Sequence, residues 1–383
     1  MSGIAFYAPM KPPDHPVPSG DRRMARLLIA ALATAGYEPE LACRYRSHPG
    51  RIADPEARAR QARIAQVGGG LARTLARRLA RSSRRPKAWF SYHLYYKAPD
   101  HLGPEVAARL EIPYFVAEAS FAPKRAGGPW DDGHRSVATA VRAARAVFCI
   151  NPNDRACLEP LVDDAGRLVA LPPFLDHAPY RAAQGDRTRL RKATAGRFGL
   201  PLDEPWLLAV GMMRPGDKLA SYRLLAAALV RLPTRRWRLI VAGDGPARGA
   251  VTAAFAEVGV ADRVTMTGEL PQAQVADLYA AADLMAWPAV REAYGMALLE
   301  AQAAGLPVVA GRTDGVPATV AEGRTGLLVQ PGDAAAFADA LAALLAAPDR
   351  RAAMGAAAMA RVEDGHTVAA AAAILRRTME PHL

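Results

Sequence analysis

Cysteine, long apolar runs and a secretion signal are scarce or missing in this sequence. Its 383 residues include only three cysteines, Cys43, Cys149 and Cys157, which lack the spacing of metal ligands. We therefore expect buried, free thiols in a reducing compartment and no disulfide framework. No apolar run approaches the roughly 20 residues that span a bilayer. Residues 1–16 also lack the basic-then-apolar pattern of an exported protein. These absences predict a cytoplasmic protein.

Acidic and aromatic residues are nearly absent from one long segment. Residues 44–87 hold twelve arginines and one lysine but only two acids, so they carry +11 of the formal net charge of +12. A localised basic segment favours an acidic partner. Proteins that hold single-stranded nucleic acid interleave aromatic with basic side chains, yet residues 46–87 contain no Phe, Trp or Tyr. We therefore do not expect nucleic acid as a partner.

Residues 61–81, inside this basic segment, have the pattern of an amphipathic helix. One interpretation is a helix of the first domain with a solvated arginine face. The other is a helix that docks on anionic lipid headgroups, which would place the protein peripherally on the inner face of the cytoplasmic membrane. The pattern leaves both open. The apolar side comprises Ile64, Val67, Leu71, Leu75 and Leu79, and the basic side Arg73, Arg77 and Arg81.

Short apolar strands alternate with amphipathic helices along the second half of the chain. Such continuous apolar strands indicate a parallel sheet that helices cover on both faces. The first half repeats the pattern less clearly, and the Pro- and charge-rich residues 171–192 resemble a connection between domains. The predicted fold class is α/β, with two doubly wound Rossmann-like domains facing a central cleft. Domains of this kind bind ligands at the carboxyl ends of their strands.

Two cations and a helix start follow neighbouring strands of the second half. Arg214 and Lys218 follow the strand predicted over 206–212, and Tyr294-Gly295-Met296 opens a helix after the strand 284–288. A helix N-terminus presents unpaired N–H groups to an anion, and Gly295 lets the backbone approach it closely. This combination fits a diphosphate. Gly295 and Met296 would act through their backbone N–H groups, whereas the Tyr294 ring is expected mainly to pack.

Glu292 and Glu300 flank the same helix start. Carboxylates would repel a diphosphate, so we expect them to accept hydrogen bonds from neutral hydroxyl groups. Glu292 would meet a sugar on one side of the phosphates and Glu300 a ribose on the other. A pair of glutamates at this spacing is common by chance, and its ordinary interpretation is solvated helix charge. The neighbouring cations favour a sugar nucleotide.

The motifs of the second half occur in the order of a known family. The stretch EAYGMALLE (292–300) resembles the E-x7-E motif of retaining glycosyltransferases of the GT-B fold, family 4. Residues 210–218 (VGMMRPGDK) and 241–246 (VAGDGP) are similar to that family's diphosphate strand and its G-x-G-P turn. By this resemblance Glu292 contacts the donor sugar, Glu300 the ribose, Arg214 and Lys218 the diphosphate, and the strand end at Gly268 the base.

The first half resembles the family less closely. The family's Gly-rich loop corresponds to PVPSGDRR, where Ser19 and Gly20 stand, so Gly20 is predicted to bind the donor. Family members often carry a histidine after a middle strand of this domain, but here that stretch offers Glu118 and Ser120. His93, which ends an earlier strand, is the candidate for that catalytic role.

The resemblance implies a metal-independent, hexosyltransferase-like enzyme that needs no cofactor. A nucleotide sugar would be the donor, and a saccharide or lipid-linked molecule the acceptor, in bacterial envelope or exopolysaccharide synthesis. Leaving-group charge would be stabilised by the cations and the helix start. The implied domains are an acceptor-side domain over 1–175, a donor-binding domain over 176–365, and a C-terminal helix in 366–383 that packs back on the first domain.

Two other classes of function stay open at this point. A nucleotide-sugar epimerase could use the same fold, and it would need no second substrate. A non-catalytic basic protein could use residues 44–87 to bind a membrane or nucleic acid, with binding that weakens as salt rises.

Overall fold

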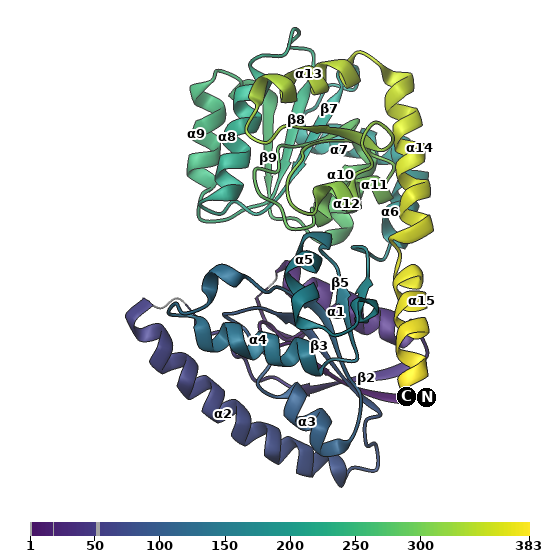
Figure 1. Ribbon diagram of the computed structural model, residues 1–383. Helices are drawn as coiled ribbons and strands as arrows, with labels where there is room; N and C mark the ends of the chain where they lie inside the picture. The colour runs from purple at the N-terminus through teal and green to yellow at the C-terminus, as the bar shows by residue number, and fades with distance from the viewer. Residues whose placement is uncertain (1, 18, 51–53) are drawn as a thin grey trace. The chain divides into compact units, whose positions relative to one another are not determined.

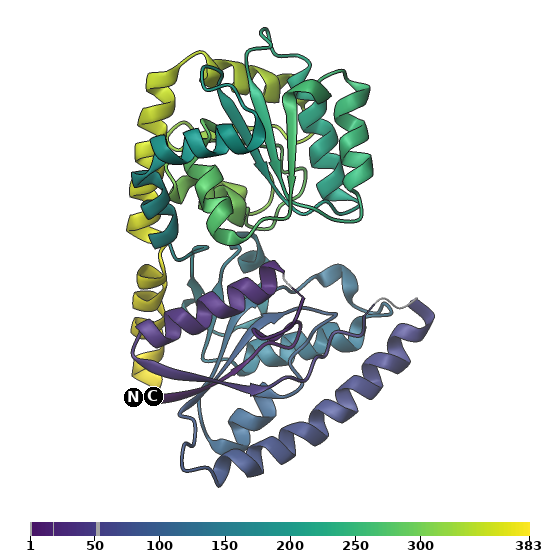
Figure 2. The same cartoon turned by 180° about the vertical axis from the view of Figure 1, so that it is seen from behind.

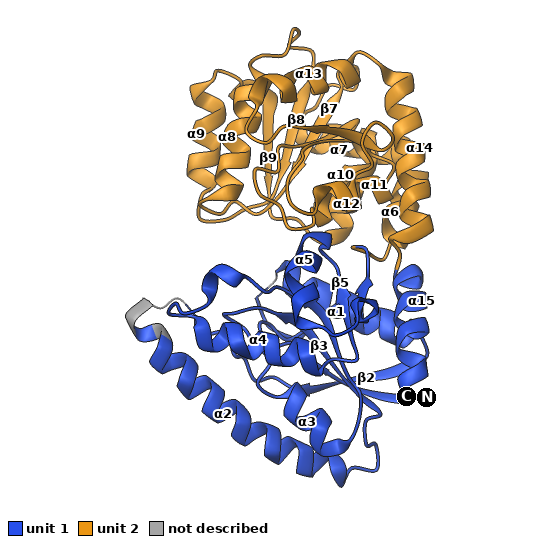
Figure 3. Ribbon diagram, in the orientation of Figure 1, with its two compact units in different colours: residues 1–172, 368–383 blue, residues 173–367 orange. Residues whose placement is uncertain are grey.

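The chain folds into two compact units in a computed structural model that describes residues 2–17, 19–50 and 54–383. Unit 1 comprises Met1–Pro172 and Val368–Leu383, and unit 2 comprises Pro173–Thr367 (Figure 3). Each unit is built on one six-stranded parallel sheet with helices on both faces. The α/β, doubly wound fold class predicted from the strand pattern is therefore confirmed.

The sheet of unit 1 has the strand order β2-β1-β3-β4-β5-β6, with every pair parallel. The order reverses between β1 and β3, and the carboxyl ends of these two strands flank the point where doubly wound sheets bind ligands. The strands are β1 (Ser2–Tyr7), β2 (Tyr37–Cys43), β3 (Ala88–Leu94), β4 (Tyr114–Ala119), β5 (Ala146–Cys149) and β6 (Leu168–Ala170).

Helices cover this sheet in two layers. On one face α1 (Gly20–Thr34) packs against α15 (Val368–Met379), the last helix of the chain, as Figure 2 shows in purple and yellow. The other face carries α2 (Asp54–Ala80), α3 (Gly103–Leu110) and α4 (Asp131–Ala143), and the short α5 (Arg155–Leu158) follows β5.

Helix α2 is continuous through its three glycines, and only part of its apolar side packs on the rest of unit 1. A Cβ atom on Gly68 would lie 2.6 Å from His101 Cβ, so the glycine is needed for close packing at this point. The buried side of the helix then includes Leu75, whereas Val67 and Leu71 are 46% and 36% exposed. Val67 and Leu71 therefore lie on the outer face of the helix, so the apolar side listed from the sequence is buried only in part.

The sheet of unit 2 has the order β12-β11-β10-β7-β8-β9, again with every pair parallel. Its order reverses between β7 and β10, so the loops after these two strands flank the expected ligand site. The strands are β7 (Trp206–Val210), β8 (Arg238–Ala242), β9 (Val264–Gly268), β10 (Leu284–Trp287), β11 (Val308–Gly311) and β12 (Gly326–Val329).

Two helical layers enclose this second sheet (Figure 1). One layer contains α8 (Asp217–Leu229), α9 (Arg248–Glu257) and α13 (Ala334–Leu345). The other contains α6 (Ala178–Gly185), α7 (Arg187–Phe198), α10 (Gln272–Ala281), α11 (Met296–Ala303) and α14 (Pro348–Gly365), and the short α12 (Val316–Thr319) precedes β12. Most of the Pro- and charge-rich stretch that resembles a connection therefore forms α6 and α7, which pack on α10.

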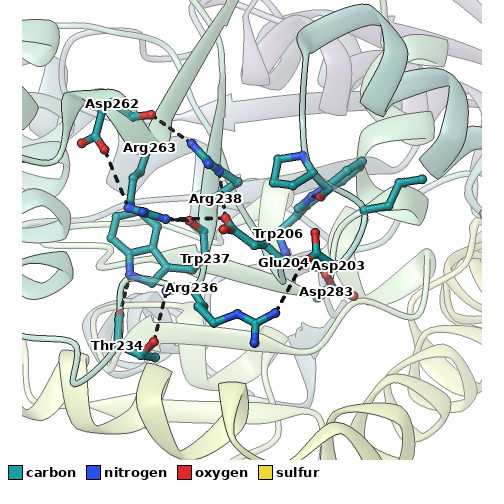
Figure 4. Close-up of polar contacts among 12 residues, drawn as sticks. Asp203, Glu204, Trp206, Thr234, Arg236, Trp237, Arg238, Asp262, Arg263 and Asp283 are labelled. Atoms are coloured by element: carbon teal, nitrogen blue, oxygen red, sulfur yellow. Dashed lines mark hydrogen bonds and ion pairs between the residues drawn. The ribbon is translucent and has the colours of Figure 1, made fainter.

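Ion pairs gather around the amino ends of β7 and β8 (Figure 4). Glu204 accepts from Arg238 at 2.8 Å and lies 3.5 Å from Arg263. Asp283, which precedes β10, accepts the Trp206 backbone N–H at 2.7 Å. These groups stabilise the amino edge of the sheet, so the opposite edge is the one that remains for a ligand.

The segments that lead into and out of unit 2 lie side by side within it. Leu175 donates its N–H to the His366 carbonyl at 2.9 Å and forms a parallel bridge with Thr367. The His366 Nδ1 atom lies 2.7 Å from the Pro173 carbonyl oxygen. The segment that enters unit 2 and the segment that leaves it are therefore hydrogen-bonded to each other.

Two expectations from composition can be compared with the structure. All three cysteines are free, and Cys149 is buried while Cys43 and Cys157 are only partly buried. Over residues 2–17, 19–50 and 54–383, no helix combines the length and apolar character needed to cross a membrane.

Candidate functional site

Lys218 and Glu292 form an ion pair where the strand order of unit 2 reverses. Lys218 is the second residue of α8, which follows β7, and Glu292 lies on the loop after β10. The Lys218 ammonium contacts Glu292 Oε2, and the two side chains are 30% and 18% exposed. The structure thus brings together one of the predicted diphosphate cations and the predicted sugar-binding carboxylate.

Trp287, the last residue of β10, lies beneath this ion pair. Its indole N–H donates to Glu292 Oε2 at 3.2 Å, and the Lys218 ammonium lies 5.1 Å from its ring centroid. The ring packs edge-on against Tyr222 at 5.0 Å, and the Tyr222 hydroxyl donates to the Gly211 carbonyl at 2.8 Å. Because Trp287 is fully buried, it gives both charged groups a rigid support. No motif in the sequence indicated a role for Trp287.

Residues 288–295, which carry Glu292, form a loop that we call the glutamate loop. Helix α11 begins directly after it, at Met296. Gly295 caps it in a left-handed conformation (φ 69°), and a Cβ atom there would lie 2.8 Å from Leu298 Cδ1. The position therefore requires glycine. Its carbonyl accepts the Leu298 and Leu299 N–H groups at 2.8 and 3.1 Å, which starts the helix where the sequence predicts.

The glutamate loop is fixed by the segment that follows β11. The Thr313 hydroxyl donates to the Ala289 carbonyl at 2.8 Å, and the Thr319 hydroxyl donates to the Tyr294 carbonyl at 2.6 Å. A Cβ atom on Gly315 would lie 1.9 Å from the Ala293 carbonyl oxygen, so backbone meets backbone here. Tyr294 is half-buried in this loop, as expected of a packing ring.

Glu300 lies inside unit 2 rather than on its surface. It occupies the fifth position of α11, is 5% exposed, and accepts a hydrogen bond from the Tyr279 hydroxyl of α10 at 3.1 Å. The two helices are thereby joined through this carboxylate. Contact between Glu300 and a ribose stays a prediction.

Arg214, unlike the buried Glu300, is exposed to solvent. It lies on the loop between β7 and α8, and its guanidinium makes no hydrogen bond or ion pair with any residue in the described part of the chain. Of the two predicted diphosphate cations, Lys218 is therefore engaged by Glu292, and Arg214 extends into solvent.

Glycines pack the loops after β7, β8 and β9 against one another. A Cβ atom on Gly243 would lie 2.0 Å from the Gly211 carbonyl oxygen, and one on Gly245 would lie 2.4 Å from that of Met213. Gly268, at the end of β9 with φ 74°, accepts the Gly243 N–H at 2.9 Å. The G-x-G-P turn is thus needed for loop packing, and Gly268 lies at the carboxyl edge where its base-binding role is predicted.

Unit 1 has a charged cluster at its own strand-reversal point. His93 at the end of β3 has its Nδ1 atom 3.0 Å from Asp21 Oδ1 in the first turn of α1, and its Nε2 atom 3.9 Å from Glu118 Oε1 at the end of β4. His93 and Glu118 both have left-handed backbones (φ 61°), which is strained for residues other than glycine. Glu118 is 7% exposed.

These neighbours change the protonation of His93. Burial favours the neutral ring, but the Glu118 carboxylate and the hydrogen bond to Asp21 outweigh it and raise the pKa of His93 to about 9. For Asp154, in the same cluster, burial acts in the other direction and raises the pKa of the carboxyl to about 6. The carboxylates around His93 therefore favour its protonated form, in which both ring nitrogens are hydrogen-bond donors.

Gly20 opens α1 beside this cluster. The preceding Ser19 caps the helix by accepting the Arg22 N–H at 3.2 Å. A Cβ atom on Gly20 would meet nothing within 4 Å, so its packing does not require glycine, and its donor-binding role stays a prediction. Asp21 and Asp154 could not be predicted as members of this cluster, because only folding brings them close to His93. In the part of the chain that the structure describes, no three His, Cys, Asp or Glu side chains are grouped to hold a metal ion.

The fold defines the class of protein. Two six-stranded, parallel, helix-covered sheets form the GT-B architecture. The sucrose-phosphate synthase of Thermosynechococcus elongatus superimposes over 100% of this chain and 99% of its own with a TM-score of 0.73 at 22% identity. The Anabaena protein HepE, solved in complex with UDP, covers 100% of both chains with a TM-score of 0.75 at 16% identity.

Sequence relatives give the family. The family model described as glycosyl transferases group 1 matches residues 204–347. A D-inositol 3-phosphate glycosyltransferase from Streptomyces scabiei is 31% identical over 325 residues, 79% of this chain and 71% of that protein. A second such enzyme, from Catenulispora acidiphila, is 37% identical over 229 residues, and there the match spans 52% of the relative's length. The chain belongs to the group 1 glycosyltransferases.

Proposed function

We propose that the protein transfers a sugar from a nucleotide-sugar donor to a saccharide or lipid-linked acceptor with retention of anomeric configuration. The observation that carries the proposal is the Lys218–Glu292 pair, which lies at the strand-reversal point of unit 2 beside the start of α11. An ammonium, a carboxylate and a helix N-terminus are the groups that a diphosphate joined to a polyol requires.

The diphosphate is assigned to Arg214, Lys218 and the backbone N–H groups at Gly295 and Met296. Breaking the anomeric C–O bond leaves negative charge on the nucleoside diphosphate, and prearranged donors stabilise that charge by several kcal/mol, roughly 3–4 kcal/mol for one donor. The exposed guanidinium of Arg214 can turn to the phosphates without breaking a contact within the described residues.

The remaining parts of the donor are assigned to the edges of the same site. Glu292 accepts hydrogen bonds from the sugar hydroxyl groups, and Glu300 contacts the ribose. The strand end at Gly268 meets the base. The transferred sugar would be attacked on the face that its leaving phosphate occupied, with that phosphate as base, so no carboxylate nucleophile is required.

Unit 1 is assigned the acceptor side. Charged His93, held by Asp21 and Glu118, would donate a hydrogen bond to a reacting sugar or acceptor oxygen. Gly20 is the candidate for backbone contact with the donor from this unit. The names of the relatives add inositol 3-phosphate to the acceptors that should be tested.

A lipid-linked acceptor would also suit the outer face of α2. Val67 and Leu71 are exposed there, and the exposed side chains of Arg63, Arg77 and Arg78 lie on the same helix. Apolar side chains surrounded by arginines match the boundary between anionic headgroups and acyl chains. We include peripheral binding to an anionic, bacterial-type membrane in the proposal, with envelope or exopolysaccharide synthesis as its setting.

A panel of nucleotide sugars tests the proposal. We expect one UDP- or GDP-sugar to raise the melting temperature and then to release its nucleoside diphosphate faster when acceptors, including inositol 3-phosphate, are added. Proton NMR of the product should show the anomeric configuration of the donor. Epimerisation without an acceptor would instead indicate an epimerase, and binding without turnover by any acceptor would indicate a non-catalytic protein.

A further inference from the structure

Glu292 Oε2 receives two donors of different kinds. One is the Lys218 ammonium and the other is the neutral indole N–H of Trp287, at 3.2 Å. The ammonium also lies over the Trp287 ring, so it has a second, weaker attraction that does not depend on the carboxylate. The two charged groups thus share one aromatic support but can separate from each other.

A diphosphate that binds Lys218 must compete with Glu292 for the ammonium. Both partners are acceptors, and holding them together on one lysine would place three like charges within a few ångströms. The indole N–H carries no charge and does not interact with the phosphates in this way. It can therefore hold the carboxylate after the ammonium has left it.

We infer that Lys218 exchanges Glu292 for the donor diphosphate, while Trp287 is a positioning residue that keeps Glu292 in place for the sugar hydroxyl groups. This inference rests on the proposed function, because it requires a nucleotide sugar at the site. The exchange couples the two halves of the donor: the phosphates take the ammonium, and the sugar hydroxyls satisfy the carboxylate oxygen that the ammonium has left.

The same exchange makes the site discriminate against its own product. A nucleoside diphosphate offers no hydroxyl group to Glu292 and carries an additional negative charge at its terminal phosphate. It would therefore leave Glu292 without its ionic partner and beside an anion. Glu292 lowers the affinity for the product relative to the donor, which favours product release after transfer.

Calorimetric titration with inorganic pyrophosphate and with UDP tests the exchange. We expect Glu292→Gln to bind both anions about 5–10-fold more tightly than the wild type, equivalent to about 1.0–1.4 kcal/mol, although its transfer rate falls. The gain should persist in an Arg214→Gln background and disappear in a Lys218→Gln background. This pattern identifies Lys218 as the group that is released.

A companion variant separates positioning from packing. Trp287→Phe keeps an aromatic ring under Lys218 but removes the indole N–H, so we expect unchanged pyrophosphate affinity and a turnover number about 10-fold lower at saturating donor. A parallel loss of affinity and melting temperature would instead assign Trp287 a purely structural role.

The outcomes distinguish the two levels of the proposal. If the wild type and the Glu292→Gln variant bind neither pyrophosphate nor any nucleotide, the proposed donor site is wrong. The proposed exchange, which depends on that site, is then wrong as well. If they bind, but Glu292→Gln shows no gain or keeps its gain without Lys218, the exchange is overturned and the proposed function stands.

Discussion

The His93 ring of β3 is joined to the first turn of α1 through a hydrogen bond from its Nδ1 to Asp21 Oδ1, at 3.0 Å. Asp21, Glu118 and Asp154 all face this one ring from neighbouring elements of unit 1. The charge part of the stabilisation that this cluster gives unit 1 therefore depends on the imidazole keeping its second proton.

The stability of the protein should consequently fall as pH rises from 6.5 to 9. The pKa of His93 is raised to about 9 from an ordinary value of 6.5, so its contribution is complete below pH 6.5 and is lost as pH passes 9. A shift of this size corresponds to about 3 kcal/mol as an upper bound. Urea denaturation at pH 6.5, 7.5 and 9 measures it.

His93→Asn is the matched variant, because asparagine tolerates the left-handed backbone at this position. It should be less stable than the wild type at pH 6.5 and nearly equal to it above pH 9. A constant difference across this range would show that the charge of His93 does not stabilise unit 1.

Asp283→Asn should destabilise unit 2 by roughly 2–4 kcal/mol. Asp283 is mostly buried and accepts from Arg187 at 2.8 Å, from Arg191 at 2.9 Å and from the Trp206 N–H at 2.7 Å. The side-chain amide of the asparagine carries no charge, so Arg187 and Arg191 lose their countercharge. Asp203→Asn, which removes an exposed partner of Arg236, is the control and should change stability by about 0.5 kcal/mol or less. Equal losses in both variants, measured by urea denaturation, would contradict this account.

Gly295→Ala should lower both stability and donor affinity. A left-handed backbone with a Cβ atom costs about 1–2 kcal/mol, and this Cβ would also press on Leu298. Donor affinity should fall because the start of α11 shifts. Gly249→Ala in α9 meets nothing within 4 Å and should be neutral or slightly stabilising. Thermal melts with and without donor separate the two effects.

Arg214→Ala should fold normally, because Arg214 is exposed and the guanidinium has no partner within the described residues. We expect a turnover number about 100-fold lower with a smaller change in KM, since the charge it stabilises develops as the sugar leaves. Arg223→Ala, an exposed cation farther along α8, should leave the kinetics unchanged. Wild-type turnover in Arg214→Ala would remove this residue from the donor site.

Replacing Val67 and Leu71 together by serine should weaken binding to vesicles of phosphatidylglycerol about 10-fold, because two apolar side chains no longer enter the headgroup region. Wild-type binding should decline with salt and be weak on phosphatidylcholine. Serine at Leu202 and Val230, two exposed apolar residues of unit 2, is the control. Cosedimentation that is identical for both double variants would favour the solvated-face interpretation of α2.

The strand pattern predicted the fold class because strands buried on both faces must be apolar throughout. All six residues of Tyr114–Ala119 are buried, for example. Helix α2 was harder to predict, because its orientation depends on the contact between Gly68 and His101, two residues that only tertiary packing brings together. Periodicity alone could not show that Val67 and Leu71 face outward.

The candidate site in unit 2 was predictable to the extent that its residues follow strand ends. Lys218 lies in the first turn of the helix after β7 and Glu292 on the loop after β10, and these two strands are neighbours in the sheet. Trp287 gave a weaker signal, a tryptophan that ends an apolar strand, which usually indicates packing alone. No sequence signal pointed to Asp154, because its place beside His93 depends on the conformation of the loop after β5.

The division of the chain also sets an order of events during synthesis. Unit 2 is one uninterrupted stretch, whereas unit 1 is incomplete until α15 has been made and has packed on α1. The flank of unit 1 that α15 covers therefore stays exposed until this last α-helix of the chain has packed on α1, which makes its docking the closing step of folding. Chains that lack it would present that flank to chaperones and proteases.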